Sequence, residues 1–131
     1  MVDYKGLMKQ AIIAREQSYS PYSKFRVGAA LLCEDGSIYL GCNIENAAYS
    51  PTNCAERTAF FKAVSEGKRA FRAIAIAGGK DDLVECFPCG VCRQVMIEFC
   101  DSETFEVICG NTEEQIKVFK LKELVPYGFQ L

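Results

Sequence analysis

Histidine and tryptophan are both absent from this chain of 131 residues. Without an imidazole, the Ser-His and Cys-His mechanisms of nucleophilic catalysis are excluded, and the acid–base groups that remain are Glu, Lys, Tyr and a metal-activated water. Long apolar runs are absent too: no stretch approaches the roughly 20 apolar residues that span a bilayer, and the first residues do not resemble a secretion signal. These absences predict a cytoplasmic protein without a membrane partner.

Basic clusters are also missing. The chain carries 15 Lys and Arg against 17 Asp and Glu, a net charge of −2, and no block of Lys or Arg stands out. A nucleic-acid binder needs a basic surface, and a binder of single strands adds a groove of aromatic and basic side chains. We therefore expect a small-molecule partner and no nucleic acid. Half of the residues are hydrophobic, which is enough for a single domain over residues 1–131.

Cysteine, in contrast, is plentiful. Its eight positions are Cys33, Cys42, Cys54, Cys86, Cys89, Cys92, Cys100 and Cys109. In a short secreted chain they would suggest disulfides, but without a secretion signal a metal site or a catalytic role is favoured. Cys33, Cys100 and Cys109 are interpreted as small buried apolar residues.

Apolar periodicity and turn signals predict an α/β fold. The predicted order is a helix (Asp3–Gln17, capped by Asp3), a hairpin (Arg26–Cys33 and Ser37–Cys42, turning at Asp35-Gly36), a helix (Cys54 to about Ser65, capped by Thr52 or Asn53), a strand (Phe71–Ala77), a helix (Pro88 just before it or in its first turn, ending near Asp101) and two strands (Phe105–Cys109 and Ile116–Phe119). The last connection is too short for a parallel crossover, so its strands should pair antiparallel. We expect a three-layer α/β/α arrangement with a five-stranded mixed sheet.

Two cysteine motifs each open a predicted helix: Cys54-Ala55-Glu56-Arg57 and Pro88-Cys89-Gly90-Val91-Cys92. Ligands in open α/β sheets bind beyond the carboxyl ends of strands, and both motifs follow a strand. Helix N-termini favour thiolate, the form that binds metals. Three thiolates leave the fourth position of a tetrahedral zinc for water or substrate. Cys54, Cys89 and Cys92 are therefore the predicted ligands of one Zn²⁺ per chain.

Other interpretations of these cysteines stay open. Cys86 could join the three to close a four-thiolate structural site, and Cys89 with Cys92 could form a thiol–disulfide pair. The catalytic zinc site is favoured because a redox pair needs no Cys54-Ala55-Glu56, and because Cys86 falls in a loop rather than at a helix start.

Glu56, two residues after a predicted ligand, is the only obvious general base. It can take a proton from a metal-activated water and pass it to a ring nitrogen and then to a leaving amine, which is hydrolytic deamination. Three thiolates would leave a zinc site with a net charge near −1. Arg57 is predicted to offset that charge through hydrogen bonds to the sulfurs.

Cys-Ala-Glu-Arg followed by Pro-Cys-Gly-x-Cys-Arg-Gln resembles the zinc-dependent cytidine deaminase family, in its homotetrameric, three-cysteine type. The resemblance covers roughly residues 19–129. It includes Ser20-Pro21-Tyr22-Ser23-Lys24-Phe25, Val27-Gly28-Ala29-Ala30-Leu31, Gly41-Cys42-Asn43-Ile44-Glu45-Asn46-Ala47 and Gln94-Val95-Met96.

The resemblance implies conversion of cytidine and 2′-deoxycytidine to the uridine forms with release of ammonia, in pyrimidine salvage. It also implies that Asn43 and Glu45 hold the ribose, that Phe25 packs on the pyrimidine, and that the backbone near Ala55 contacts the base. Tyr49 and Phe129 would enter the sites of neighbouring subunits in a homotetramer.

Two other functions remain candidates. A deaminase of a modified cytosine nucleoside such as blasticidin S would share the metal site, but Asn43, Glu45 and Phe25 favour an ordinary ribose. A non-catalytic zinc-stabilised module would share the cysteines and would give Glu56 no role.

Overall fold

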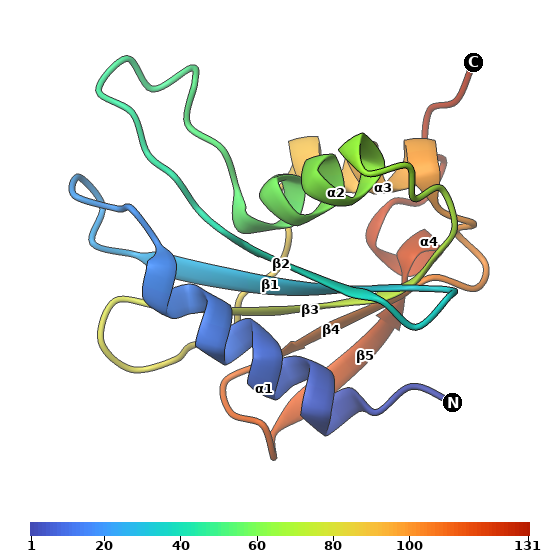
Figure 1. Ribbon diagram of the computed structural model, residues 1–131, viewed down its shortest axis with the longest axis horizontal. Helices are drawn as coiled ribbons and strands as arrows, with labels where there is room; N and C mark the ends of the chain where they lie inside the picture. The colour runs from blue at the N-terminus through green and yellow to red at the C-terminus, as the bar shows by residue number, and fades with distance from the viewer.

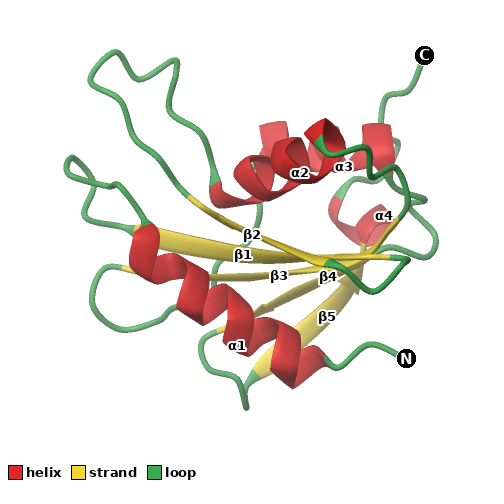
Figure 2. Cartoon of the chain, viewed as in Figure 1, coloured by secondary structure: helices red, strands yellow, loops and turns green.

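The computed structural model describes all residues from Met1 to Leu131, which form one five-stranded sheet with helices on both faces (Figures 1 and 2). The elements in chain order are α1 (Tyr4–Ala14), the short 3₁₀ helix η1 (Arg15–Gln17), β1 (Arg26–Cys33), β2 (Ile38–Cys42), α2 (Ala55–Ser65), β3 (Phe71–Gly79), α3 (Gly90–Phe99), β4 (Glu106–Gly110), β5 (Ile116–Lys120) and α4 (Leu121–Leu124). The predicted α/β class is confirmed. None of the helices combines the length and the apolar character that crossing a membrane requires.

The sheet is mixed, with the strand order β2-β1-β3-β4-β5. Strand β1 pairs antiparallel with both β2 and β3, and β3 pairs parallel with β4. Strand β4 pairs antiparallel with β5, as predicted. Because β2 and β3 both run opposite to β1, their carboxyl ends lie at the same edge of the sheet. The connections that lead into α2 and α3 therefore leave from one edge, which brings the two cysteine motifs together.

Strand β3 separates two hydrophobic layers by simple alternation. Its alanines, Ala73, Ala75 and Ala77, belong to the cluster under α1, whereas Ile74 and Ile76 belong to the cluster under α2 and α3. Successive side chains of a strand point to opposite faces, so this Ala-Ile pattern gives one face small residues and the other large ones. Helix α1 covers the first face and α2 and α3 cover the second, which makes the three layers (Figure 1).

Cysteines take the cap positions of both site helices. Asp3 caps α1 as predicted, because its side chain accepts from the Gly6 N–H at 3.0 Å. For α2 the predicted caps, Thr52 and Asn53, are wrong: the N-cap residue is Cys54 and the helix begins at Ala55.

The side chains of Thr52 and Asn53 bind elsewhere, to the Asn46 N–H at 3.0 Å and to the Thr58 hydroxyl at 3.2 Å. The third helix begins at Gly90 with Cys89 as its N-cap, so Pro88 lies just before the helix, in agreement with the prediction. The predicted strands are all present, with ends that differ by up to two residues.

Candidate active site

Three thiols from two helix starts form one group. The sulfurs of Cys54, Cys89 and Cys92 all lie within 4.8 Å of one another, and those of Cys54 and Cys89 are 3.6 Å apart. Sulfurs bound to a tetrahedral zinc at about 2.3 Å would be separated by about 3.8 Å, so the Cys54–Cys89 pair matches that separation and the group is compatible with zinc. All eight cysteines are free, and three donors leave one coordination position open. The three predicted ligands are thus brought together.

The thiol group is arranged to carry negative charge. A hydrogen bond with Cys92, followed by bonds with Arg57 and Cys89, lowers the pKa of Cys54 to about 5. The same Cys54–Cys92 interaction raises the pKa of Cys92, because Cys92 then acts as the donor. The Cys92 N–H also points at the Cys89 sulfur, at 3.5 Å. Donors directed at sulfur stabilise thiolate, which is the metal-binding form.

Arg57 lies against this group as predicted. Its Nη2 donates to the Cys54 sulfur at 3.2 Å, one turn along the same helix start. Its Nε is buried and has no partner in the protein. The guanidinium therefore lies on the thiol side of the helix, with its Nε shielded from solvent.

Glu56 is buried, with 4% of its surface exposed. Burial raises the pKa of its carboxyl to about 7, and the nearby charge of Cys54 acts in the same direction. A carboxyl with such a pKa can hold or release a proton near neutral pH, as a general acid–base group must. A divalent cation held by the neighbouring thiols would lower this pKa, since it favours the ionised form.

Glycine allows the site helix to lie directly on the sheet. A Cβ atom at Gly41, on β2, would clash with the backbone of α2 at Ala55 and Ala59. Because there is none, the first turn of α2 lies against the end of β2, which fixes the direction of Glu56 and Arg57.

A cavity of about 160 Å³ adjoins these groups. It contains six of the predicted site residues: Asn43, Glu45, Cys54, Ala55, Glu56 and Cys89. Its other lining residues are Cys86, the alternative fourth ligand, and four residues to which the sequence assigned no role in the site: Val27, Thr52, Asn53 and Phe87. Two of the three thiols, the buried carboxyl and the two polar side chains predicted to bind ribose thus line the same cavity.

Asn43 and Glu45 already bind the chain itself. The side-chain oxygen Oδ1 of Asn43 accepts from the Val27 N–H at 2.9 Å and from the Ser18 hydroxyl, and its Nδ2 donates to the Phe25 carbonyl at 2.8 Å. The Glu45 carboxylate accepts from the N–H groups of Tyr22 and Ser23 and from the Ser23 hydroxyl. These bonds hold the segment before β1 against the cavity wall and orient both side chains.

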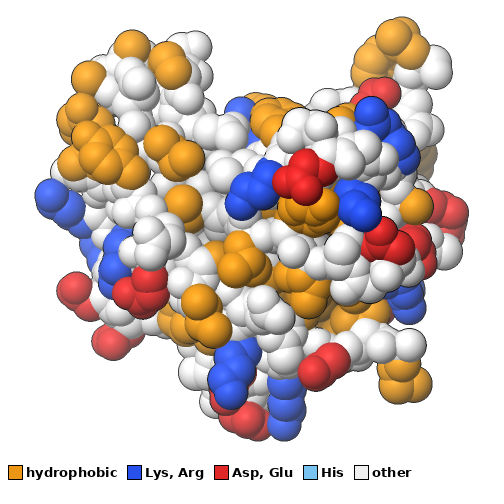
Figure 3. All heavy atoms as spheres, viewed as in Figure 1, with side chains coloured by type: hydrophobic (Ala, Val, Ile, Leu, Met, Phe, Trp, Pro, Cys, Tyr) orange, Lys and Arg blue, Asp and Glu red, His pale blue; other side chains and the backbone are white.

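Three predicted substrate contacts do not line this cavity: Phe25, Tyr49 and Phe129. Phe25 is half-buried and packs at Gly78, where a Cβ would lie 3.0 Å from its ring. Tyr49 is 78% exposed and Phe129 is 66% exposed. They lie on the projecting β2–α2 connection and near the projecting C-terminal end, where Figure 3 shows hydrophobic side chains.

Cys86 is not part of the thiol group, although it lines the cavity. Its sulfur packs at Gly78, 2.9 Å from the place of a Cβ there, and burial raises the pKa of its thiol to about 12. A protonated thiol binds metal poorly. The three-thiol arrangement is therefore favoured over a four-thiolate structural site.

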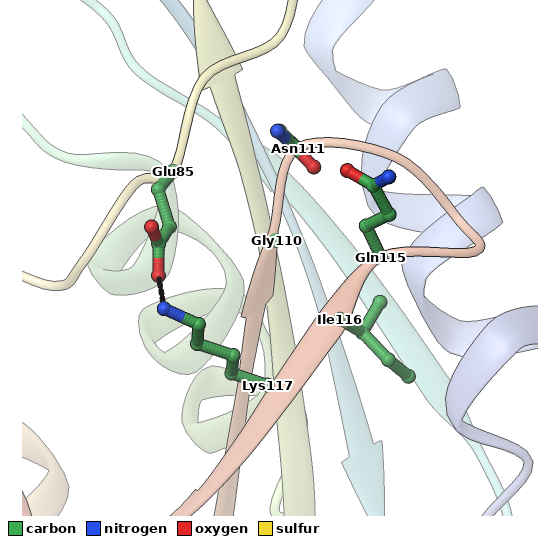
Figure 4. Close-up of a pocket in the computed structure, with 6 residues that line it drawn as sticks. All are labelled: Glu85, Gly110, Asn111, Gln115, Ile116 and Lys117. Atoms are coloured by element: carbon green, nitrogen blue, oxygen red, sulfur yellow. Dashed lines mark ion pairs between the residues drawn. The ribbon is translucent and has the colours of Figure 1, made fainter.

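A second hollow, of about 270 Å³, lies between Glu85 and the β4–β5 turn (Figure 4). Its lining residues are Glu85, Gly110, Asn111, Gln115, Ile116 and Lys117. Although it is the larger of the two hollows, it has neither a thiol that could bind a metal nor a buried carboxylate that could move a proton.

The α/β/α fold, the three-thiol group with one open position and the buried carboxylate beside it define a zinc-dependent hydrolytic enzyme. Comparison with known proteins makes the assignment specific. The family model described as the cytidine and deoxycytidylate deaminase zinc-binding region matches residues 1–109. The chain belongs to this family, and zinc is its cofactor.

Relatives and solved structures agree with this assignment over nearly the whole chain. A cytidine deaminase of Sporosarcina psychrophila is 53% identical over 128 residues, which are 98% of this chain and 92% of that protein. A cytidine deaminase of Halalkalibacterium halodurans is 52% identical, over 98% of this chain and 95% of that protein. The crystal structure of cytidine deaminase from Burkholderia pseudomallei superposes with a TM-score of 0.88 at 45% identity, covering 98% of this chain and 100% of that one.

Proposed function

We propose that this protein deaminates cytidine to uridine with release of ammonia. The observation that carries the proposal is the position of Glu56, a buried carboxyl in the same cavity as the thiols that fit zinc. A proton carrier beside a site with one open metal position is what addition of water to a pyrimidine ring requires. The cytidine deaminases that match the whole chain support the same reaction.

Cys54, Cys89 and Cys92 would hold the zinc. When bound, zinc supplies a Lewis acid that activates a water molecule for attack on the ring. Glu56 takes a proton from that water and delivers it to ring nitrogen N3. Glu56 then moves the second proton to the exocyclic amine, which leaves as ammonia. One C–O bond forms and one C–N bond breaks, so no other reactant is needed.

Arg57 would support this reaction through its hydrogen bond to a zinc-binding thiol. Its bond to Cys54 withdraws electron density from the sulfur. Thiolates that carry less negative charge would donate less to a bound zinc, and this lowers the pKa of water at the open position.

Asn43 and Glu45 would hold the ribose. An amide nitrogen has two donors, and Asn43 uses one of them on the Phe25 carbonyl, so one N–H stays free for a sugar oxygen. A carboxylate has about four acceptor positions, and Glu45 uses three of them, which leaves room for a ribose hydroxyl. We propose 2′-deoxycytidine as a second substrate and the Ala55 backbone as a contact of the base. We also propose that Phe25, which lies with the lining residue Cys86 at Gly78, packs on the pyrimidine when substrate is bound.

The wider assembly is proposed as well. Tyr49 and Phe129 are exposed and lie outside the cavity of their own chain. This supports a homotetramer in which the two side chains of each subunit enter the sites of neighbouring subunits. Residues 1–131 would act as one domain in pyrimidine salvage. The cytoplasmic location expected from the sequence stays a prediction.

The two other candidate functions are not favoured. Action on a modified nucleoside such as blasticidin S has no support among the matching cytidine deaminases. A non-catalytic zinc module would have no use for the buried Glu56.

The test measures zinc content per chain and ammonia release from cytidine for the wild type, Glu56→Ala and Glu98→Ala. Loss of the proton carrier should lower kcat by about 10³-fold or more while zinc stays near one per chain. Glu98, an exposed residue of α3, is the matched control and should leave both values unchanged. Wild-type turnover in Glu56→Ala would refute the mechanism, and absence of turnover in the zinc-loaded wild type would refute the function.

A further inference from the structure

One wall of the catalytic cavity is a short segment that is docked on β5. The segment runs from Glu85 to Pro88 and leads into α3. Glu85 pairs with Lys117 at 2.6 Å (Figure 4), and the ring of Phe87 packs edge-on against Phe119, with centroids 5.7 Å apart and planes at 61°. Lys117 and Phe119 are two residues apart, so they lie on the same face of β5. Two contacts with the same spacing therefore hold the segment on the strand.

Phe87 is the only aromatic residue that lines the cavity. Its side chain is 43% exposed, so much of the ring surface is available to a ligand. The next residue is the buried Pro88, and a residue before proline is restricted to extended backbone. Phe119 packs edge-on against the ring and itself packs against the main core. The ring is thus partly open to the cavity and held in place by its neighbours.

The position of Phe87 indicates which part of a nucleoside it would meet. It is two residues from the thiol of Cys89, whereas Asn43 and Glu45 reach the cavity from the β2–α2 connection. The reacting ring must lie near the metal thiols and the sugar near the two polar residues. An aromatic side chain at the thiol end would therefore meet the pyrimidine, and aromatic faces bind flat bases well.

We propose that Phe87 contacts the substrate by packing against the pyrimidine ring, and that Phe119 and Lys117 are positioning residues that hold it there. This inference rests on the proposed function. It assigns a substrate contact to the residue just before the second cysteine motif, beside the role proposed for Phe25.

The test compares Phe87→Ala with Phe61→Ala, a variant of a 47% exposed phenylalanine of α2 that does not line the cavity. In Phe87→Ala the KM for cytidine and the calorimetric Kd for uridine should both rise by about 5- to 10-fold, because a stacking surface is lost. The kcat should stay within about 2-fold, since no proton-transfer group changes. Phe119→Ala should raise KM by about 2- to 3-fold with the same kcat, and Phe61→Ala should match the wild type.

Zinc content and the thermal midpoint separate a binding effect from a folding effect. If Phe87→Ala does not fold, Phe87→Leu, which keeps an apolar side chain, should raise KM by about 3-fold. Wild-type KM and uridine Kd in whichever variant folds would overturn the proposal. If the wild type releases no ammonia, the proposed function fails, and the uridine Kd still decides the role of Phe87. Absence of both turnover and uridine binding in the wild type would overturn both proposals.

Discussion

The thiol corner and the outer rim of the site differ in how much of their geometry one chain supplies. The thiol corner, which consists of Cys54, Glu56, Arg57, Cys89 and Cys92, has its sulfurs within zinc-binding range and its carboxyl buried. The outer rim, which consists of Tyr49 and Phe129, is 78% and 66% exposed and touches no part of its own cavity. The groups proposed for the chemistry thus come together within one chain, whereas the rim residues stay outside the cavity of that chain.

Packing explains the difference. The thiol corner lies at two helix starts that press on the sheet, where Ala55 and Cys92 are almost fully buried. The rim lies on the projecting connection before α2 and near the end of the chain (Figure 1), where both side chains stay largely exposed. Side chains at buried helix termini are held in position by packing, whereas side chains on exposed loops are held less precisely.

The largest expected effect tests whether three thiols alone bind the metal. Cys89→Ala should lose zinc and lower kcat by about 10³-fold or more, because two thiols cannot complete the donor set. Cys86→Ala, three residues earlier, should keep about one zinc per chain. Metal analysis after gel filtration checks both variants, and zinc loss in Cys86→Ala would make Cys86 part of the site.

A smaller effect should follow when charge compensation within the thiol corner is removed. Arg57→Ala should lower kcat by about 10- to 100-fold with zinc retained, as expected for a partner of a metal ligand. Arg57→Lys should recover only part of the loss, since an ammonium group cannot reproduce the guanidinium geometry. The measurement is steady-state kinetics at equal zinc content. An unchanged kcat in Arg57→Ala would make this arginine a purely structural neighbour of Cys54.

Asn43 lies between the two regions, because it both orders the chain and faces the cavity. Asn43→Ala should lower the free energy of unfolding by about 2 kcal/mol, since the Val27 N–H and the Phe25 carbonyl each lose a partner. It should also raise the KM for cytidine by about 10-fold. Denaturant titration and kinetics measure the two effects, with Asn111→Ala, an exposed residue of the β4–β5 turn, as control. A lower stability with normal KM would leave Asn43 only its structural role.

The smallest expected effects test the rim. Tyr49→Ala and Phe129→Ala should raise KM by about 3-fold, with an increase that grows on dilution as subunits separate. Kinetics and light scattering over a range of protein concentrations check this, and Ile13→Ala, a variant of an exposed residue of α1, serves as control. A fully active monomer would end the shared-site proposal and would make the rim ordinary surface.

Local signals predicted the elements well, because each depends on residues close in sequence. Asp35-Gly36 predicted the β1–β2 turn, and Gly36 indeed has a φ of 90°. The caps of α2 were mispredicted because Thr52 and Asn53 have good capping side chains, yet Cys54 is the residue next to the helix. Capping preference alone does not reveal that a thiol needed for metal occupies the cap position.

The sequence by itself predicted the donor set and the proton carrier and carried the family resemblance, because these follow from residue types at fixed spacing in two short motifs. Only the tertiary structure decided which side chains share the cavity. It brought in Phe87, kept Cys86 in the wall but out of the thiol group, and left Phe25 outside. The physical reason is that cavity walls come from segments distant along the chain. Phe87 is held by β5, more than thirty residues later, and no local pattern encodes that contact.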